Sequence, residues 1–125
     1  MTTRLILIID DDEDIREVAR VSLELVGGWE VATAPSGAYG LTMAATLQPD
    51  AILLDVMMPD MDGPATWWAL QADAATSRIP VILLTAKVAT SDRAAFANLG
   101  VAAVIAKPFD PMRLTSQVQA ALGWG

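Results

Sequence analysis

The chain has 125 residues and a formal net charge of −7 at pH 7, and it contains neither cysteine nor histidine. The length suits one domain with its own core, and the missing residue types exclude disulfide frameworks, the usual zinc sites and histidine-based triads. The negative charge argues against direct binding to nucleic acid or anionic lipid, which need a basic surface.

The predicted elements alternate strictly between strand and helix along the chain. Continuous runs of Val, Ile and Leu predict strands buried on both faces, and apolar residues at helical spacing predict the intervening helices. Asp12 suits the N-cap of the first helix, and Gly27-Gly28 marks its end. Strands are predicted at residues 5–9, 29–33, 51–55, 81–84 and 101–106, and helices at 12–26, 36–48, 64–74, 90–99 and 110–122.

This alternation predicts a parallel sheet with helices on both faces, because crossovers between parallel strands are right-handed. The expected fold is therefore a doubly wound three-layer αβα sandwich. The apolar runs are far shorter than the roughly 20 residues that a membrane span needs, and residues 1–4 lack signal-peptide architecture. We therefore expect a cytoplasmic protein that does not contact the membrane, with residues 1–125 forming a single domain without an effector domain.

Chemically complementary groups follow four of the predicted strands. Asp10 and Asp11 end the first strand, Asp55 ends the third, Thr85 follows the fourth and Lys107 follows the last. Ligands of open α/β sheets gather at these carboxyl ends. Three carboxylates in one cleft repel each other unless a cation or proton compensates, and Mg²⁺ prefers oxygen ligands. The pattern predicts a magnesium site, although Asp10 and Asp11 could instead only cap the helix that follows.

Four motifs in this order make the chain resemble the receiver domain of two-component response regulators, in particular single-domain receivers like the chemotaxis regulators. They are IIDD at 8–11, LLDVMMPDMDG at 53–63, LTA at 84–86 and AKPF at 106–109. The resemblance covers essentially the whole chain. It implies the flavodoxin-like strand order 2-1-3-4-5 and a signalling receiver that is not an enzyme, although it assists its own phosphorylation and dephosphorylation.

The resemblance also implies a role for each acid of the cleft. Asp55 is the nucleophile that accepts a phosphoryl group from a sensor histidine kinase or a histidine phosphotransfer protein. Asp11 ligates Mg²⁺ directly, together with Asp55 and the backbone carbonyl of Met57, whereas Asp10 acts mainly through metal-bound water. A carboxylate nucleophile and charge neutralisation agree with the general chemistry of phosphoryl transfer.

Thr85 and Lys107 are implied to bind phosphoryl oxygens, and the threonine is implied to start the conformational switch. The family carries a large aromatic residue in the last strand at the position of Val104. Because valine has no large ring to turn inward, we hypothesise that Thr85 and the loop 86–89 carry the change into the helix at 90–99. The face formed by 90–99, 101–106 and 110–122 is the implied surface for an unknown downstream protein.

Adjacent tryptophans in the predicted helix 64–74 have different expected environments. Trp67 falls on the inner face of this helix, and Trp68 points about 100° away around the helix. We therefore expect Trp67 to be buried and Trp68 to be partly exposed.

Three alternative functions agree less well with the sequence pattern. A Mg²⁺-dependent phosphatase of the haloacid dehalogenase type also uses a strand-end aspartate, but it expects a second acid where this chain has Met57. A nucleotide-binding Rossmann domain lacks support, because no glycine-rich phosphate-binding motif opens a helix. A receiver fold that serves only as a binding module is opposed by the complete set of strand-end residues, whereas Val104 is compatible with it.

Overall fold

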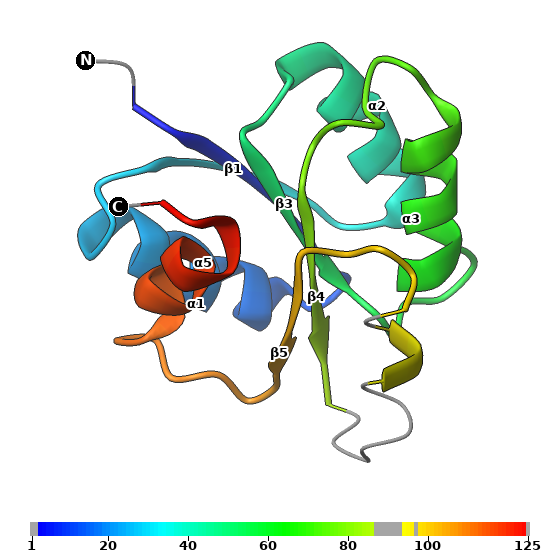
Figure 1. Ribbon diagram of the computed structural model, residues 1–125. Helices are drawn as coiled ribbons and strands as arrows, with labels where there is room; N and C mark the ends of the chain where they lie inside the picture. The colour runs from blue at the N-terminus through cyan, green and yellow to red at the C-terminus, as the bar shows by residue number, and fades with distance from the viewer. Residues whose placement is uncertain (1–2, 87–93, 97, 125) are drawn as a thin grey trace.

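The computed structural model describes residues 3–86, 94–96 and 98–124, and its five parallel strands form one sheet. The strand order is β2-β1-β3-β4-β5, which confirms the predicted flavodoxin-like order (Figure 1). The strands are β1 (Leu5–Ile9), β2 (Glu30–Ala34), β3 (Ala51–Asp55), β4 (Val81–Thr85) and β5 (Ala103–Ala106).

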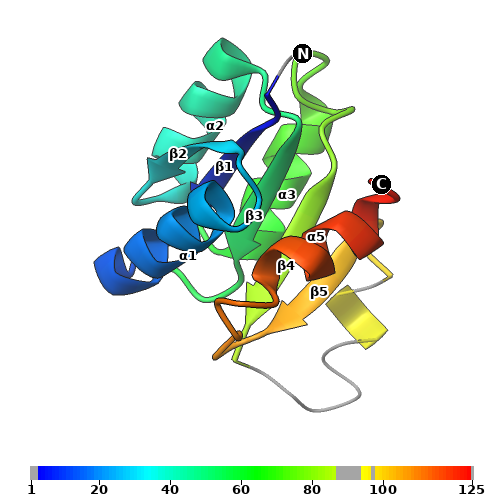
Figure 2. The ribbon, with the colours of Figure 1, turned by 90° about the vertical axis from the view of Figure 1, so that its left-hand side faces the viewer.

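Helices cover both faces of the sheet, as expected for a doubly wound sandwich. Helices α1 (Glu13–Leu25) and α5 (Leu114–Leu122) lie on one face, and α2 (Gly37–Leu47) and α3 (Gly63–Ala72) lie on the other (Figure 2). Residues 94–96 are helical, but 90–93 and 97 lie outside the described residues. The extent of the helix predicted at 90–99 therefore stays a prediction.

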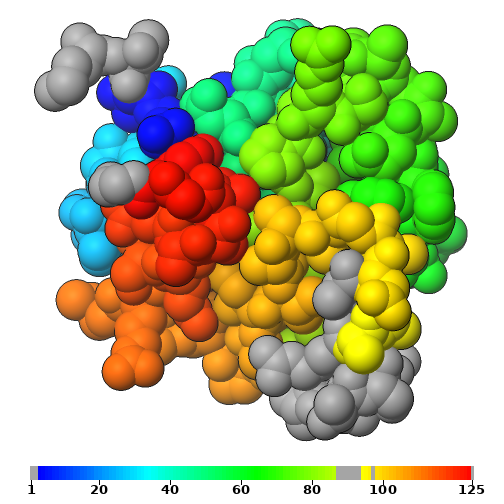
Figure 3. All heavy atoms as spheres, in the orientation of Figure 1, coloured from blue at the N-terminus to red at the C-terminus, as the bar shows by residue number. Residues whose placement is uncertain are grey.

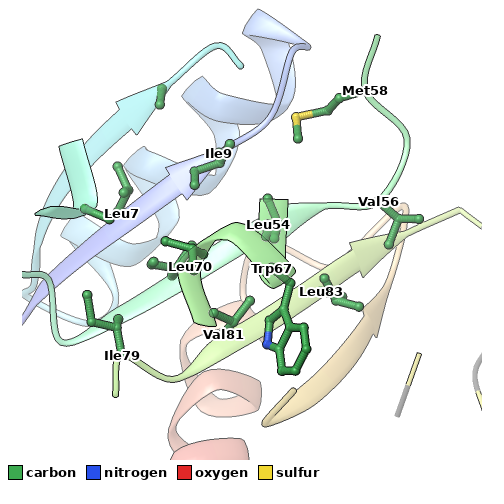
Figure 4. Packing of buried hydrophobic residues seen from close by; sticks show 13 residues of the cluster. Leu7, Ile9, Leu54, Val56, Met58, Trp67, Leu70, Ile79, Val81 and Leu83 are labelled. Atoms are coloured by element: carbon green, nitrogen blue, oxygen red, sulfur yellow. The ribbon is translucent and has the colours of Figure 1, made fainter. Parts of the chain in front are cut away.

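The sheet separates two apolar clusters, which explains why the strand sequences are apolar without interruption. Successive side chains of a strand point to opposite faces, so Leu7 and Ile9 pack toward α2 and α3, whereas Ile6 and Ile8 pack toward α1 and α5. Figure 4 shows the first cluster, with Trp67 of α3 beside the sheet. Burying each large apolar side chain contributes about 1.5–3 kcal/mol, and this core fixes the carboxyl ends of β1 and β3.

Local hydrogen bonds displace two predicted boundaries, and the backbone conformation of Gly100 accompanies a third. Strand β2 begins at Glu30 instead of residue 29, because the main-chain N–H of Trp29 donates to Leu23 O in the preceding turn, at 3.3 Å. Helix α5 begins at Leu114 instead of residue 110, because the Asp110 carboxylate accepts from Met112 N at 2.9 Å and forms a turn. Strand β5 begins at Ala103 instead of residue 101. It follows Gly100, whose φ of 102° lies outside the extended conformation of a strand.

The two ends of the described chain pack together at the edge of the sheet away from the strand-end acids. The Trp29 and Trp124 rings meet edge to face at 5.3 Å, and the Arg4 guanidinium lies 3.9 Å from the Trp124 ring centre. Figure 3 shows this C-terminal segment against the start of the chain. Among the described residues no helix is long and apolar enough to cross a membrane.

Candidate functional site

A cleft of about 230 Å³ opens at the carboxyl ends of the strands. It combines acids from the ends of β1 and β3 with groups from the loops that follow β3, β4 and β5. The lining residues are Asp10, Asp11, Asp12, Asp55, Met57, Ala86 and Lys107. The structure thus brings the predicted acids and the predicted lysine together at one edge of the sheet.

Asp10 is fully buried, and hydrogen-bond donors satisfy both of its carboxylate oxygens. Its Oδ1 accepts from the main-chain N–H of Asp12 at 2.9 Å, and its Oδ2 accepts from Lys107 Nζ at 2.7 Å. Asp11, the next residue, is exposed on the cleft. Two adjacent aspartates therefore occupy very different environments.

Asp55 ends β3 with only 4% of its surface exposed. Its Oδ1 accepts from Lys107 Nζ at 3.0 Å and from Met57 N at 3.3 Å. Burial raises the pKa of this carboxyl from 3.8 to about 6; the Lys107 hydrogen bond opposes the shift, and the nearby charge of Asp10 adds to it. Without a bound cation, Asp55 is an acid whose ionised form is disfavoured.

Lys107 bridges the two buried acids from the loop after β5. Its burial disfavours the charged ammonium, but hydrogen bonds to Asp10 and Asp55 outweigh burial and raise the pKa of the lysine. The main-chain N–H of Lys107 donates to Thr85 O at 2.8 Å, which ties this loop to the end of β4. One ammonium therefore pairs with Asp10 and Asp55, and Asp11 leaves the cleft with surplus negative charge when all three acids are ionised.

The donor set of the cleft fits a hard divalent cation. One carboxylate oxygen from each of Asp10, Asp11 and Asp55 lies within 4.8 Å of the other two. Within the described residues no donor occupies the Asp11 carboxylate, whereas Asp10 already serves two donors. This difference favours Asp11 as the direct ligand and Asp10 as an indirect one. Mg²⁺ is typically held by one or two carboxylates and keeps several waters.

The loop between β3 and α3 carries Met57 past the cleft and is held by a close backbone approach. Gly63 N donates to Val56 O at 2.9 Å, and a Cβ added to Gly63 would lie 2.6 Å from Asp55 O. Glycine is therefore the residue type that this approach requires. The Met57 side chain is 59% exposed, while its main chain follows Asp55 directly.

Thr85 reaches the same edge of the sheet but does not line the cleft in this conformation. It ends β4, is 1% exposed and pairs with Ala106 of β5. The next residue, Ala86, does line the cleft. Most of the loop in the hypothesised switch, residues 87–89, lies outside the described residues. Val104 is half-buried against the cluster on the α2 and α3 side of the sheet.

Sequence reasoning missed Arg16, whose Nη1 donates to the carbonyl oxygen of Asp10 at 2.8 Å. The available signal was its place four residues after Asp12, which the N-cap puts one turn into α1. The acids after Asp11 are partly explained as caps, as expected. Asp12 Oδ1 accepts from Asp14 N at 2.9 Å and from Ile15 N at 3.3 Å.

Comparisons with known proteins agree with this geometry. A family model described as the response regulator receiver domain matches residues 6–119. RpaA of Synechocystis sp., a DNA-binding dual master transcriptional regulator, is 38% identical over 117 residues, which cover 94% of this chain and 48% of the relative. The transcriptional regulatory protein PrrA of Mycobacterium tuberculosis is 38% identical over 122 residues, which cover 98% of this chain and 51% of PrrA. The chain thus spans about half the length of these curated relatives.

Solved structures of similar length superpose closely on this chain. The chemotaxis response regulator CheY4 of Vibrio cholerae matches with a TM-score of 0.88 and 28% identity, covering 96% of this chain and 99% of CheY4. A putative response regulator from Chloroflexus aurantiacus matches with a TM-score of 0.88 and 31% identity. The match covers 98% of this chain and 99% of the Chloroflexus chain.

Proposed function

The chain belongs to the response regulator receiver domain family of two-component signalling, and we propose that it is a phosphoacceptor whose Asp55 takes a phosphoryl group from a histidine kinase or a histidine phosphotransfer protein. The observation that carries this proposal is the placement of Asp55. Its carboxylate opens onto the cleft, 3.0 Å from the Lys107 ammonium and within 4.8 Å of two further acids.

The proposed reaction transfers a phosphoryl group from an imidazole nitrogen to a carboxylate oxygen. An Asp55 oxygen attacks phosphorus, the new P–O bond forms, and the P–N bond to the donor breaks with its electron pair returning to the imidazole. Lys107 is already hydrogen-bonded to Asp55, so its ammonium can turn to a phosphoryl oxygen as a charge-assisted donor. Thr85 is proposed to supply a hydroxyl donor to another phosphoryl oxygen.

We further propose that Asp11, Asp55 and the Met57 carbonyl hold Mg²⁺ directly, with Asp10 acting through a water. When bound, Mg²⁺ supplies positive charge that offsets the carboxylates and the entering phosphoryl group. Asp55 must be ionised both to ligate a cation and to attack phosphorus. Its pKa of about 6 therefore predicts that both processes weaken as the pH falls below 6.

The match of the receiver-domain model to residues 6–119 supports a signalling receiver over the phosphatase alternative. We propose that residues 1–125 act as one receiver domain that controls a protein partner through the face around β5 and α5. RpaA and PrrA, whose names describe transcriptional regulators, are each about twice as long as this chain. The net charge of −7 favours protein partners over direct contact with nucleic acid for these 125 residues.

Intact mass measurement after incubation with acetyl phosphate and Mg²⁺ tests the phosphoacceptor proposal. We expect the wild type to gain the mass of one phosphoryl group and Asp55→Asn to gain none. Asp60→Asn is the matched control, because Asp60 is an exposed carboxylate in the loop after β3. This control should label like the wild type. An unlabelled wild type, or equal labelling of Asp55→Asn, would favour a binding module that works without phosphorylation on Asp55.

A further inference from the structure

The Arg16 side chain reaches from α1 back to the end of β1. Its Nη1 lies 2.8 Å from the main-chain oxygen of Asp10. This carbonyl stands between two regular elements: β1 ends at Ile9, and the first main-chain hydrogen bond of α1 runs from Arg16 N to Asp12 O at 3.0 Å. Among the described residues the Arg16 guanidinium is the donor that meets the Asp10 carbonyl.

This carbonyl needs a donor because Asp10 is fully buried. A buried main-chain oxygen without a partner costs free energy comparable to a lost hydrogen bond. Arg16 supplies a charged donor, and charge-assisted hydrogen bonds are stronger than neutral ones. The contact therefore holds the peptide between β1 and α1 in one orientation.

The peptide that Arg16 holds also sets the direction of the acidic cleft residues. The Asp10 carbonyl and the Asp11 nitrogen belong to one planar unit, so fixing the carbonyl fixes the point from which Asp11 projects. The same segment is held through the Asp10 side chain, by Asp12 N at 2.9 Å and Lys107 Nζ at 2.7 Å. Arg16 adds a restraint on the main chain, next to the exposed acid.

We propose that Arg16 is a positioning residue for the metal site, which keeps the Asp10–Asp11 peptide oriented so that the Asp11 carboxylate faces Asp55. The inference rests on the proposed function and adds a residue to it. Arg16 is not among the residues that line the cleft, so it acts through the main chain and not as a ligand.

The charge and the contact of Arg16 have opposite effects on a divalent cation. A guanidinium near the acids repels Mg²⁺, so removing its charge alone should tighten Mg²⁺ binding. Losing the restraint on the Asp10 carbonyl should weaken Mg²⁺ binding, because the two direct carboxylate ligands no longer keep their spacing. The sign of the change in affinity therefore separates the two roles.

Arg20 offers a matched control on the same helix. It lies one turn further along α1 and pairs with Glu17 and Glu24, at 2.6 Å for the Glu24 oxygen, and not with a residue of the cleft. Arg20→Ala removes one positive charge from α1, as Arg16→Ala does, but leaves the Asp10 carbonyl untouched.

The experiment is calorimetric titration of the phosphate-free protein with MgCl₂ for the wild type, Arg16→Ala, Arg16→Lys and Arg20→Ala. We expect Arg16→Ala to raise the Kd for Mg²⁺ by about tenfold, which is the low end of the loss in affinity seen when residues that support metal ligands are replaced. Arg16→Lys should recover part of this loss, because its ammonium keeps the charge and a donor. Arg20→Ala should stay within about twofold of the wild type, as expected for a screened surface charge.

The possible failures are distinguishable. Equal or tighter Mg²⁺ binding by Arg16→Ala, with a binding wild type, would overturn the role of Arg16 and leave the proposed function standing. A wild type that binds no Mg²⁺ would overturn the metal site and the role of Arg16 together. If Arg16→Ala does not fold, as judged by circular dichroism, Arg16→Gln takes its place, and unchanged affinity in that variant would overturn the inference.

Discussion

The Lys107 ammonium lies 3.0 Å from the Asp55 carboxylate and contacts it through Oδ1. The same nitrogen lies 2.7 Å from Asp10 Oδ2, so one cation serves two buried acids from neighbouring strands. In the metal-free protein the Lys107 ammonium partly neutralises the acids of the cleft, and a bound divalent cation would share that task. Stability and chemistry are therefore linked through this side chain.

Replacing Lys107 with methionine should destabilise the metal-free protein at neutral pH. The Lys107 side chain is 14% exposed, and removing one partner of a buried ion pair costs about 3 kcal/mol or more because the remaining charge is uncompensated. Urea unfolding at pH 7.5 should show this loss. The loss should shrink at pH 5, where Asp55 is mostly protonated. A loss of equal size at both pH values would contradict an electrostatic origin.

Asp55 itself should limit stability above pH 6 when no metal is bound. Its folded pKa of about 6 lies above the unfolded value of 3.8, so folding favours the protonated form. The contribution of this group is fully present below pH 3.8 and is lost as the pH rises through 6. At about 1.4 kcal/mol per pKa unit, the loss reaches roughly 3 kcal/mol.

Asp55→Asn should therefore be more stable than the wild type at pH 7.5, by up to about 3 kcal/mol, and close to it at pH 4. Urea unfolding in the presence of a chelator measures the difference at each pH. Asp60→Asn, which changes an exposed carboxylate, should show no comparable pH dependence. If the wild type is as stable as Asp55→Asn at pH 7.5, the raised pKa of Asp55 in the folded protein would be refuted.

The backbone layout of the site was predictable because strand ends are visible in the sequence. Continuous apolar runs of four to six residues between turn residues are typical of buried strands, and the last residues of such strands meet at one edge when the strands are parallel. This logic correctly predicted that Asp55 and Lys107 lie at one edge of the sheet, and Figure 1 shows β3, which ends at Asp55, and β5, which ends one residue before Lys107. The covering helices followed from the same alternation.

The pairing of side chains in the cleft was not predictable from these patterns. Asp10 and Asp11 are identical in type, yet one is fully buried and the other exposed. Their difference depends on Lys107, which approaches from the far end of the chain, and on Asp12 N. The Arg16 contact was missed for the same reason, since an arginine one turn into a helix normally predicts a solvated side chain.

Gly63→Ala should disturb both stability and metal binding. An added Cβ would lie 2.6 Å from Asp55 O and 2.7 Å from the Val56 Cα, and both are main-chain atoms that cannot rotate away. Overpacking of this kind costs about 1–3 kcal/mol, and the forced shift moves the loop that carries Met57. We expect weaker Mg²⁺ binding by calorimetry in addition to earlier urea unfolding.

Gly28→Ala is the control for the Gly63 substitution. Gly28 has a φ of 69° and no atom within 4 Å of an added Cβ. It should lose only about 1 kcal/mol, from backbone strain, and keep wild-type Mg²⁺ affinity. If both variants bind Mg²⁺ like the wild type, the close approach at Gly63 does not position the site.

The adjacent tryptophans of α3 should differ sharply in their contribution to stability. Trp67 is 6% exposed and lies in the cluster between the sheet and α3, whereas Trp68 is 58% exposed, which confirms both sequence predictions. Their rings meet edge to face at 4.8 Å. Trp67→Ala should cost about 3–5 kcal/mol through the cavity that it leaves, and Trp68→Ala at most about 1.5 kcal/mol through the lost ring contact. Urea unfolding followed by circular dichroism measures both, and equal losses would mean that the ring of Trp68 is packed as tightly as that of Trp67.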